Sequence, residues 1–257
     1  MIKLNRPKFI EMNQYKKYNT WYAEPKIDGQ RCAMETRDGK TWLVREGGTV
    51  KNKQYPEVAA NTIPEGTILD GELAIMENPF RANFVNMLQR ETINNIRIKY
   101  LSEKIPATFV AFDVIKWKNK DVRDLPFFER KGILKQIIET PTLKVIQYDH
   151  VENMIPKIEA INMEGLVLKE MNGDYYSTWL KIKNYTESDF IVKGYTSESR
   201  LISALELTDI NGNYVGKVNW TGPQTKQIAE SIIGKTAVVR YMKTDSYLRF
   251  PVLKEIR

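Results

Sequence analysis

The sequence predicts an α+β protein with two domains, one at residues 1–186 and a smaller one at residues 187–257. In the first, short β-prone runs punctuated by turn residues are interspersed with a few helical segments, which is typical of antiparallel sheets flanked by helices. In the second, from Asp189 onwards, strands alternate with turns and only one helix interrupts them. Several strands with one helix in about seventy residues indicate a small closed barrel such as an OB-fold.

The elements of the first domain follow from local patterns. A tight turn at Asp28-Gly29 is expected to join two strands as a β-hairpin. A helix begins after Pro126 and ends before Pro141, whereas Pro156 disfavours the last expected helix. The expected strands are 20–26, 31–36, 41–45, 67–76, 107–117, 164–169 and 179–183, and the expected helices are 82–90, 127–139 and 152–161.

Turn signals also divide the second domain. Asn211-Gly212-Asn213 is typical of a hairpin turn. A short helix is expected before the last strand of the domain. The expected strands are 190–195, 203–208, 214–220 and 236–242, and the helix is 225–233.

The chain carries a formal charge of +7, and 42% of its 257 residues are hydrophobic, so it can bury a core and suits a polyanionic partner. Residues 235–257 hold six basic side chains against two acidic ones. A single cysteine, Cys32, and a single histidine, His150, allow neither an intramolecular disulfide nor a zinc site of cysteine and histidine. The N-terminus lacks the apolar core of a signal peptide and no apolar run reaches the length of a membrane span. We therefore expect a soluble protein of a reducing cytoplasm, without a membrane partner.

Lys26 is the candidate nucleophile, within the segment Glu24-Pro25-Lys26-Ile27-Asp28-Gly29-Gln30-Arg31. On a strand, Lys26 and Asp28 would point to the same face because side chains alternate, and Gly29 allows a sharp turn next to a ligand. A lysine amine attacks phosphorus only when it is neutral, a form that burial and nearby cations favour. A lone Lys-x-Asp-Gly is common by chance and more often marks an ordinary hairpin with surface charges. The segments that follow decide between the two interpretations.

The segment 26–31, Lys-Ile-Asp-Gly-Gln-Arg, resembles the Lys-x-Asp-Gly-x-Arg signature of ATP-dependent DNA ligases, within the covalent nucleotidyltransferase superfamily. Six ordered matches to the family's motifs cover nearly the whole chain. They imply an ATP-grasp-like nucleotidyltransferase domain at 1–186 and an OB domain at 187–257. The other five matches are 44–47 (Val-Arg-Glu-Gly), 69–73 (Leu-Asp-Gly-Glu-Leu), 109–113 (Phe-Val-Ala-Phe-Asp), 164–169 (Glu-Gly-Leu-Val-Leu-Lys) and 179–183 (Trp-Leu-Lys-Ile-Lys).

Two carboxylates and two lysines in these motifs carry the expected chemistry. Glu72 and Glu164 can hold Mg²⁺ or Mn²⁺ if they converge on one pocket, since hard cations take oxygen ligands. By similarity, Glu164 is the better metal candidate and Glu72 is an alternative ribose contact. Lys181 and Lys183 alternate on a strand and face one side, where they would neutralise the α-phosphate of ATP and keep Lys26 neutral. Each feature alone is more often a solvated strand end, and the ordered motifs favour the functional interpretation.

The resemblance also implies contacts to the nucleotide. Phe112 would stack on adenine, for which an aromatic face is suited, although a phenylalanine in an apolar strand is more often core. The backbone near Glu24 and Pro25 would read the adenine edge. Arg31 would contact the nucleotide or the terminal nucleotides of the nick, and Lys169 would join the two strand lysines.

Other residues are implied to handle DNA and pyrophosphate. Arg45 would hold the 5′-phosphate of the nick, because a planar guanidinium binds phosphate bidentately. Asp28 would position the 3′-hydroxyl or a metal. Residues 248–257 resemble the family's C-terminal motif, in which Arg249 and Arg257 are the candidates for closing over ATP and orienting the leaving pyrophosphate.

The sequence therefore predicts a monomeric ATP-dependent DNA ligase that seals nicks in duplex DNA through a lysyl-AMP intermediate, in repair, replication or recombination. The span 194–218 is too short for the long DNA-clamping insertion of some viral members. An RNA ligase or an mRNA capping guanylyltransferase shares the lysine chemistry, but Arg31 and the Leu-Arg-Phe-Pro ending at 248–251 favour a DNA ligase. A non-catalytic OB-fold nucleic-acid-binding protein is the alternative from another class, which the intact set of candidate catalytic residues disfavours.

Overall fold

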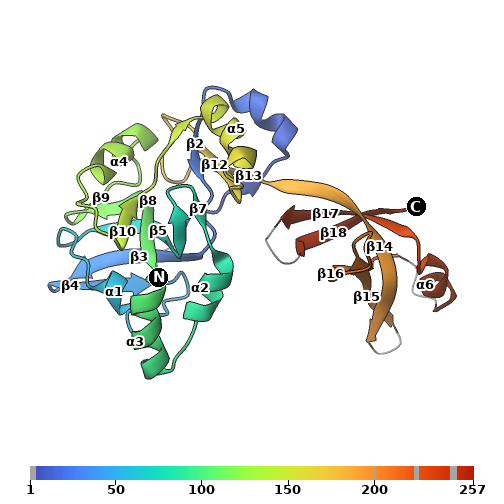
Figure 1. Cartoon of the computed structure of the whole chain (residues 1–257). Helices are drawn as coiled ribbons and strands as arrows, with labels where there is room; N and C mark the ends of the chain where they lie inside the picture. The colour runs from blue at the N-terminus through green and yellow to red at the C-terminus, as the bar shows by residue number, and fades with distance from the viewer. Residues whose placement is uncertain (1–3, 199–200, 223–225, 244–247) are drawn as a thin grey trace. The chain divides into compact units, whose positions relative to one another are not determined.

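The structure is a computed structural model that describes residues 4–198, 201–222, 226–243 and 248–257. The chain forms two compact units, which divide between Lys183 and Asn184. The first unit combines sheets with several helices, and the second is mostly β-structure (Figure 1). The functional assignment of 1–186 and 187–257 to two domains stays a prediction.

The first unit is built from short strands and helices. Its strands are β1 Lys8–Phe9, β2 Tyr22–Pro25, β3 Gln30–Arg37, β4 Lys40–Val44, β5 Ile68–Ala74, β6 Met76–Asn78, β7 Arg81–Ala82, β8 Thr108–Trp117, β9 Lys120–Asp121, β10 Leu143–Val145, β11 Asp149–His150, β12 Gly165–Lys169 and β13 Leu180–Lys183. Its helices are the 3-10 helix η1 Met12–Tyr18, α1 Pro56–Ala59, α2 Phe84–Arg90, α3 Asn95–Lys104, α4 Phe127–Leu134 and α5 Val151–Ala160.

Two sheets organise the first unit. One has the strand order β1-β13-β12-β2-β11, and the other has the order β10-β8-β5-β3-β4, with β9 paired to β8. The expectation of antiparallel sheets was wrong in part, because β1 pairs in parallel with β13 and β10 pairs in parallel with β8. These partners lie far apart in the sequence and are joined by long connections, which parallel pairing requires.

The turn after the candidate nucleophile is not the predicted hairpin. β2 pairs with β11 and β12 in one sheet, whereas β3 pairs with β4 and β5 in the other. Residues 26–29 therefore carry the chain from one sheet to the next. A methyl group at Gly29 would lie 2.2 Å from the carbonyl oxygen of Leu73, so glycine is needed here for close approach to β5 and not for a hairpin turn.

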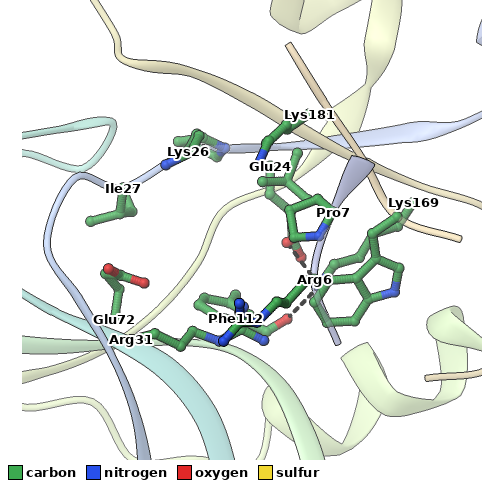
Figure 2. A pocket seen from close by; sticks show the side chains of 13 residues that line it. Arg6, Pro7, Glu24, Lys26, Ile27, Arg31, Glu72, Phe112, Lys169 and Lys181 are labelled. Carbon is green, nitrogen blue, oxygen red and sulfur yellow. Dashed lines mark hydrogen bonds and ion pairs between the residues drawn. The ribbon is translucent and has the colours of Figure 1, made fainter. Parts of the chain in front are cut away.

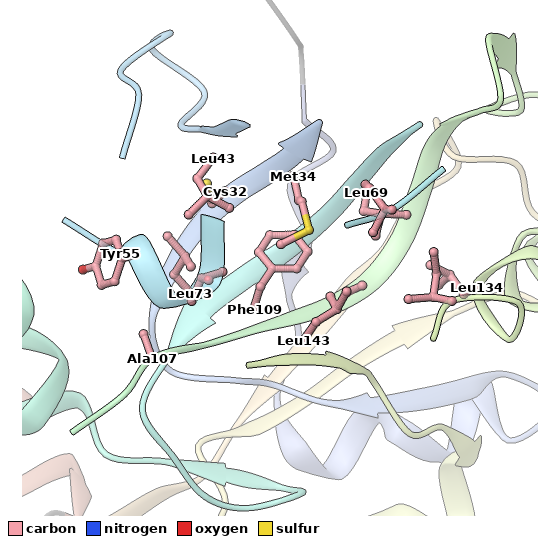
Figure 3. Close-up of a cluster of buried hydrophobic side chains, with 14 of the residues drawn as sticks. Cys32, Met34, Leu43, Tyr55, Leu69, Leu73, Ala107, Phe109, Leu134 and Leu143 are labelled. Atoms are coloured by element: carbon pink, nitrogen blue, oxygen red, sulfur yellow. The ribbon is translucent and has the colours of Figure 1, made fainter. Parts of the chain in front are cut away.

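A hydrophobic core covers the second sheet. Figure 3 shows Phe109 of β8 among the buried side chains Met34, Leu73 and Leu143. Cys32 is fully buried in the same core, and burial raises the pKa of its thiol to about 12. Close packing of this kind fixes β3, β5 and β8 relative to one another. These strands carry candidate site residues, so the core determines their positions.

Helix α5 covers the first sheet. Its Val151, Met154 and Ile158 are buried against side chains of β2, β12 and β13, and their spacing is that of one helix face. Pro156 lies inside α5. Burial of this apolar face therefore outweighs the loss of one backbone donor at the proline.

A buried arginine joins three helices of the first unit. Arg90, the last residue of α2, is fully buried and donates to the carbonyl oxygens of Leu101 and Ile105, each at 3.0 Å, at the end of α3. Its guanidinium also lies 2.8 Å from the Glu57 carboxylate of α1. Helix α3 had not been predicted, because residues 95–99 alternate between apolar and polar side chains and show no helical period.

The second unit is a five-stranded antiparallel sheet with the order β16-β15-β14-β17-β18. Thr225, the predicted first residue of the helix, lies outside the described residues. The last strand, β18, is not among the predicted strands, although it lies within the motif at residues 248–257. The elements are β14 Tyr185–Glu198, β15 Leu201–Thr208, β16 Tyr214–Asn219, α6 Lys226–Ile232, β17 Thr236–Lys243 and β18 Leu248–Ile256.

Apolar side chains of this sheet, among them Phe190, Leu205 and Val239, form one buried cluster. Within the described strands, β16 and β18 are the edges of the sheet and do not pair with each other. This half-barrel is consistent with an OB-fold, and the closed barrel stays a prediction.

We expect Arg90→Met to lower the free energy of unfolding by about 3–5 kcal/mol, because it leaves the Glu57 carboxylate without its buried partner. Urea denaturation followed by circular dichroism measures this change. Arg97→Met on the exposed face of α3 is the matched control and should change the unfolding free energy by less than about 0.5 kcal/mol. Equal stability of the two variants would contradict the role of Arg90.

Candidate active site

A pocket of about 230 Å³ lies in the first unit, with walls from strands of both sheets (Figure 2). Seven residues singled out from the sequence line it. They are Glu24, Lys26, Arg31, Glu72, Phe112, Lys169 and Lys181.

Lys26 follows β2 directly and is held by both backbone and side chain. Its N–H donates to the carbonyl oxygen of Gly165 at 2.9 Å, and its Nζ lies 2.8 Å from the Glu164 carboxylate. Gly165 has a φ of +151°, and a methyl group there would lie 2.0 Å from the carbonyl oxygen of Ile182. Only glycine therefore lets β12 pass this close to β13 while accepting the bond from Lys26.

Two lysines of β13 lie near this end of the pocket. Lys181 lines the pocket, and Lys183 lies two residues further along the strand, where side chains share a face. Burial lowers the pKa of Lys181, and the positive charges of Lys183 and Lys26 lower it further. The mutual repulsion of these ammonium groups favours the binding of an anion beside them.

Glu72 of β5 faces the pocket from the second sheet (Figure 2). Burial raises the pKa of Glu72 to about 8, against the lowering effect of the charges on Lys26 and Arg31. The charge on Glu164 raises this pKa as well. The charge on Glu164 thus disfavours the ionisation of Glu72, and a divalent cation beside both carboxylates would relieve this repulsion.

The aromatic wall of the pocket is fixed by an ion pair. The Arg31 guanidinium donates to both carboxylate oxygens of Asp70, at 2.6 and 2.7 Å, and the Tyr175 hydroxyl donates to the same fully buried carboxylate at 2.7 Å. The guanidinium carbon lies 4.7 Å from the centre of the Phe112 ring, within the range of a cation–π contact. Arg31 and Phe112 therefore present a preorganised surface to a ligand.

Glu24 of β2 lies at the opposite wall. Its carboxylate pairs with Lys169 at 3.0 Å and also with Lys131 of α4. All three side chains are buried. Because an unpaired buried charge is costly, these contacts keep Glu24 in one orientation.

Six predicted residues are not among those that line the pocket. Two of them, Glu164 and Lys183, neighbour the lining residues Lys26 and Lys181, and Arg257 follows β18 in the second unit. Asp28 is partly buried in the connection 26–29, and Arg45 is exposed in the turn that follows β4. Arg249 lies on β18 in the second unit. Their parts in a site stay predictions.

Five residues that line the pocket are not candidate site residues in the sequence analysis, namely Arg6, Pro7, Ile27, Val167 and Trp179. Arg6 and Pro7 reach it because the strand that follows them, β1, pairs with β13, and no local signal reveals such long-range pairing. Trp179 had been noted only as the first residue of a motif. Its ring centre lies 3.8 Å from the Lys169 Nζ. An aromatic residue directly before an alternating lysine strand is the signal by which it could have been found.

The fold and the pocket define a nucleotidyltransferase-type protein, with mixed sheets, flanking helices and a lysine amine at the pocket. Residues 8–183 match the family model described as ATP dependent DNA ligase domain. The chain therefore belongs to the ATP-dependent DNA ligase domain family.

Curated relatives carry this domain within longer chains. The chain is 26% identical over 210 residues to the bifunctional non-homologous end joining protein LigD of Bacillus subtilis. The aligned region covers 71% of this chain and 34% of LigD. It is 26% identical over 188 residues to the SPbeta prophage-derived DNA ligase-like protein LigB of the same organism. This aligned region covers 69% of this chain and 66% of LigB. This chain thus spans a third to two thirds of the length of these relatives.

Solved structures share the fold. A structure from a study of Lig E DNA ligases is 18% identical, covers 100% of both chains and has a TM-score of 0.70. The ligase domain of Mycobacterium tuberculosis LigD is 17% identical, covers 98% of this chain and 94% of that chain, and has a TM-score of 0.55.

No helix in the ranges that the structure describes is long and apolar enough to cross a membrane. Over the same ranges, no group of three or more His, Cys, Asp and Glu side chains gathers in a way that would hold a metal ion. A divalent cation at the pocket would therefore take most of its ligands from water and phosphate, as Mg²⁺ commonly does.

The raised pKa of Glu72 predicts a pH dependence of stability in metal-free and nucleotide-free protein. The folded protein holds this proton up to about pH 8, whereas the unfolded chain releases it near pH 4.5. The stability contributed by the protonated form is thus complete below pH 4.5 and is lost as the pH rises to about 8.

Glu72→Gln removes this titration. We expect the unfolding free energy of the wild type, relative to the variant, to fall between pH 5 and pH 8.5 in chemical denaturation with a chelator present. Glu103→Gln at the exposed end of α3 is the control and should show no such trend. A difference between wild type and Glu72→Gln that stays constant with pH would rule out the raised pKa.

Proposed function

We propose that this protein is an ATP-dependent DNA ligase that attaches AMP to Lys26 and uses it to seal nicks in duplex DNA. The observation that supports this best is the position of Lys26, which lines a pocket with Glu72 and Lys181 and pairs with Glu164. The chain belongs to the ATP-dependent DNA ligase domain family, which supports AMP transfer as the reaction of this lysine. The proposal assigns adenylyl transfer to residues 1–186 and an OB domain to residues 187–257.

In this proposal ATP binds with its base between the two sheets. Phe112 offers the aromatic face for adenine, and the backbone at Glu24 reads the edge of the base. Arg31 is the candidate contact to the nucleotide or to the terminal nucleotides of the nick. Lys181 and Lys183 neutralise the α-phosphate, which suits their mutual repulsion in the ligand-free pocket.

The proposal includes a divalent cation, Mg²⁺ or Mn²⁺, held by Glu72 and Glu164. Burial of Glu72 supports it, because the charges of Lys26 and Arg31 do not offset the effect of burial, and the pKa of Glu72 is raised in the protein alone. A bound cation would supply charge neutralisation to the phosphate oxygens.

Lys26 performs the chemistry in three displacements at phosphorus. Its Nζ attacks the α-phosphorus of ATP, forming a P–N bond while the bond to pyrophosphate breaks. The 5′-phosphate of the nick then takes AMP from Lys26, and the 3′-hydroxyl attacks that phosphate and releases AMP. In the ligand-free protein Lys26 pairs with Glu164, so Lys26 must give up this partner before its amine attacks.

Binding of nicked DNA by a monomer is the final part of the proposal. Arg45 is assigned to the 5′-phosphate, Asp28 to the 3′-hydroxyl, and Arg249 to the leaving pyrophosphate. The formal charge of +7 should make DNA binding weaken steeply with salt concentration.

Lys26→Ala should abolish the transfer of AMP to the protein and the sealing of unadenylated nicks, because the nucleophile is gone. Incubation with α-labelled ATP followed by denaturing gel electrophoresis measures the first, and a nicked duplex substrate measures the second. Lys104→Ala, at the exposed end of α3, is the matched control and should keep both activities. Equal nick sealing by the wild type and Lys26→Ala would refute the assignment of Lys26.

The same labelling assay separates this function from its alternatives. We expect label from ATP, and none from GTP or NAD. Transfer of GMP alone would indicate a capping guanylyltransferase, and transfer from NAD alone would overturn the cofactor. Labelling from ATP with sealing of nicked RNA but not nicked DNA would indicate an RNA ligase, and absence of any label would favour a non-catalytic nucleic-acid-binding protein.

A further inference from the structure

A cluster of buried charged side chains lies behind the nucleotide pocket. Each of its members is at most 3% exposed. Burial of so many charges is costly unless each is paired and hydrogen-bonded, so their arrangement is closely constrained. The five residues are Glu24, Asp113, Arg130, Lys131 and Lys169.

Two ammonium groups in this cluster converge on the same two acceptors. Lys131 and Lys169 both pair with the carboxylate of Glu24. Both also donate to the backbone carbonyl oxygen of Phe112, at 2.9 Å from Lys131 and 3.2 Å from Lys169. Lys169 has a further partner in Asp113 at 3.1 Å.

These contacts join the opposite walls of the pocket. Glu24 belongs to β2 of the first sheet and Phe112 to β8 of the second, and no hydrogen bonds of one sheet connect these strands. Both residues line the pocket. The separation of the two walls is therefore held by the lysine ammonium groups that bridge them.

Lys131 acts at a distance from any ligand in the pocket. It is not among the lining residues, and it lines a different hollow together with Lys135, Gln147 and Tyr148. A change at Lys131 consequently removes no direct contact to the nucleotide. Any effect on nucleotide binding must pass through Glu24 and Phe112.

We propose that Lys131 is a positioning residue that fixes Glu24 and Phe112 at the separation that an adenine base requires. It thereby sets the affinity and the base preference of the site without touching the nucleotide. This inference rests on the proposed function, because it takes the ligand of the pocket to be ATP.

The neighbouring Arg130 provides a matched control within the same helix. Its guanidinium pairs with Asp113 at 2.7 Å and donates to the carbonyl oxygens of Leu125 and Gly173. It is as deeply buried as Lys131. Loss of Arg130 should therefore destabilise the fold to a similar degree while leaving the two contacts between the walls in place.

The first experiment measures nucleotide binding without chemistry, by calorimetry in a Lys26→Ala background. We expect Lys131→Met to raise the Kd for ATP about tenfold and to lower the preference for ATP over GTP, since misplacing both walls weakens base recognition. Arg130→Met should lower the melting temperature and leave the Kd and the preference near their wild-type values. Lys131→Gln keeps a donor to the Phe112 carbonyl oxygen and should give a smaller rise in Kd.

The second experiment measures the rate of AMP attachment against ATP concentration in the presence of Lys26. Lys131→Met should raise the concentration for half-maximal rate and change the maximal rate less than about twofold. In a Glu24→Gln background the effect of Lys131→Met should shrink, because the carboxylate through which it acts is gone.

The outcomes separate this inference from the proposed function. Failure of the wild type to take up AMP counts against the function, while the calorimetric comparison still tests Lys131. A wild-type Kd and base preference in folded Lys131→Met, or in folded Lys131→Gln if the first variant does not fold, would overturn the positioning role. A fall in maximal rate alone, with an unchanged Kd, would overturn it as well.

Discussion

The site depends on the segment 26–29, where the chain passes from one sheet of the first unit to the other. Residues 26–29 leave β2 in one sheet and enter β3 in the other, so the candidate nucleophile stands where both sheets contribute side chains. The crossing is fixed at both ends. The backbone N–H of Lys26 donates to Gly165, and Gly29 lies against the backbone of β5 with no room for a side chain. Packing at two glycines thus decides where the Lys26 amine is located.

Electrostatics divides the surroundings of the pocket into two kinds of region. Behind the Phe112 end of the pocket, burial raises the pKa of Asp113, but the charges of Lys169 and Arg130 outweigh it and hold this pKa well below its ordinary value. Around the Lys26 end, burial raises the pKa of Glu72, and burial together with neighbouring positive charges lowers the pKa of Lys181. The charges around Asp113 are paired within the protein. The charges of Glu72 and Lys181 are paired less well, and ligands that carry both negative and positive charge would balance them.

Local sequence signals were enough for most strands and for the residues of the pocket that sit within recognisable motifs. Lys26, Glu72 and Phe112 all line one pocket, as their motifs indicated. The signals failed where distant partners decide the structure. The Asp28-Gly29 turn has the composition of a hairpin, but pairing of β2 with β12 takes the preceding strand into another sheet. The reach of Arg6 into the pocket and the bridging by Lys131 depend on contacts with residues that no local pattern specifies.

The parallel pairing of β1 with β13 has a consequence for how the protein is made. Lys8 pairs with Leu180 and Phe9 with Lys181, so β1 has no partner in its sheet until almost the whole of the first unit has been translated. Contacts of such long sequence separation form late and slowly in folding. A nascent or truncated chain would therefore hold the Lys26 segment without strand β13 and its lysines, and the pocket would be completed only after β13 has been made.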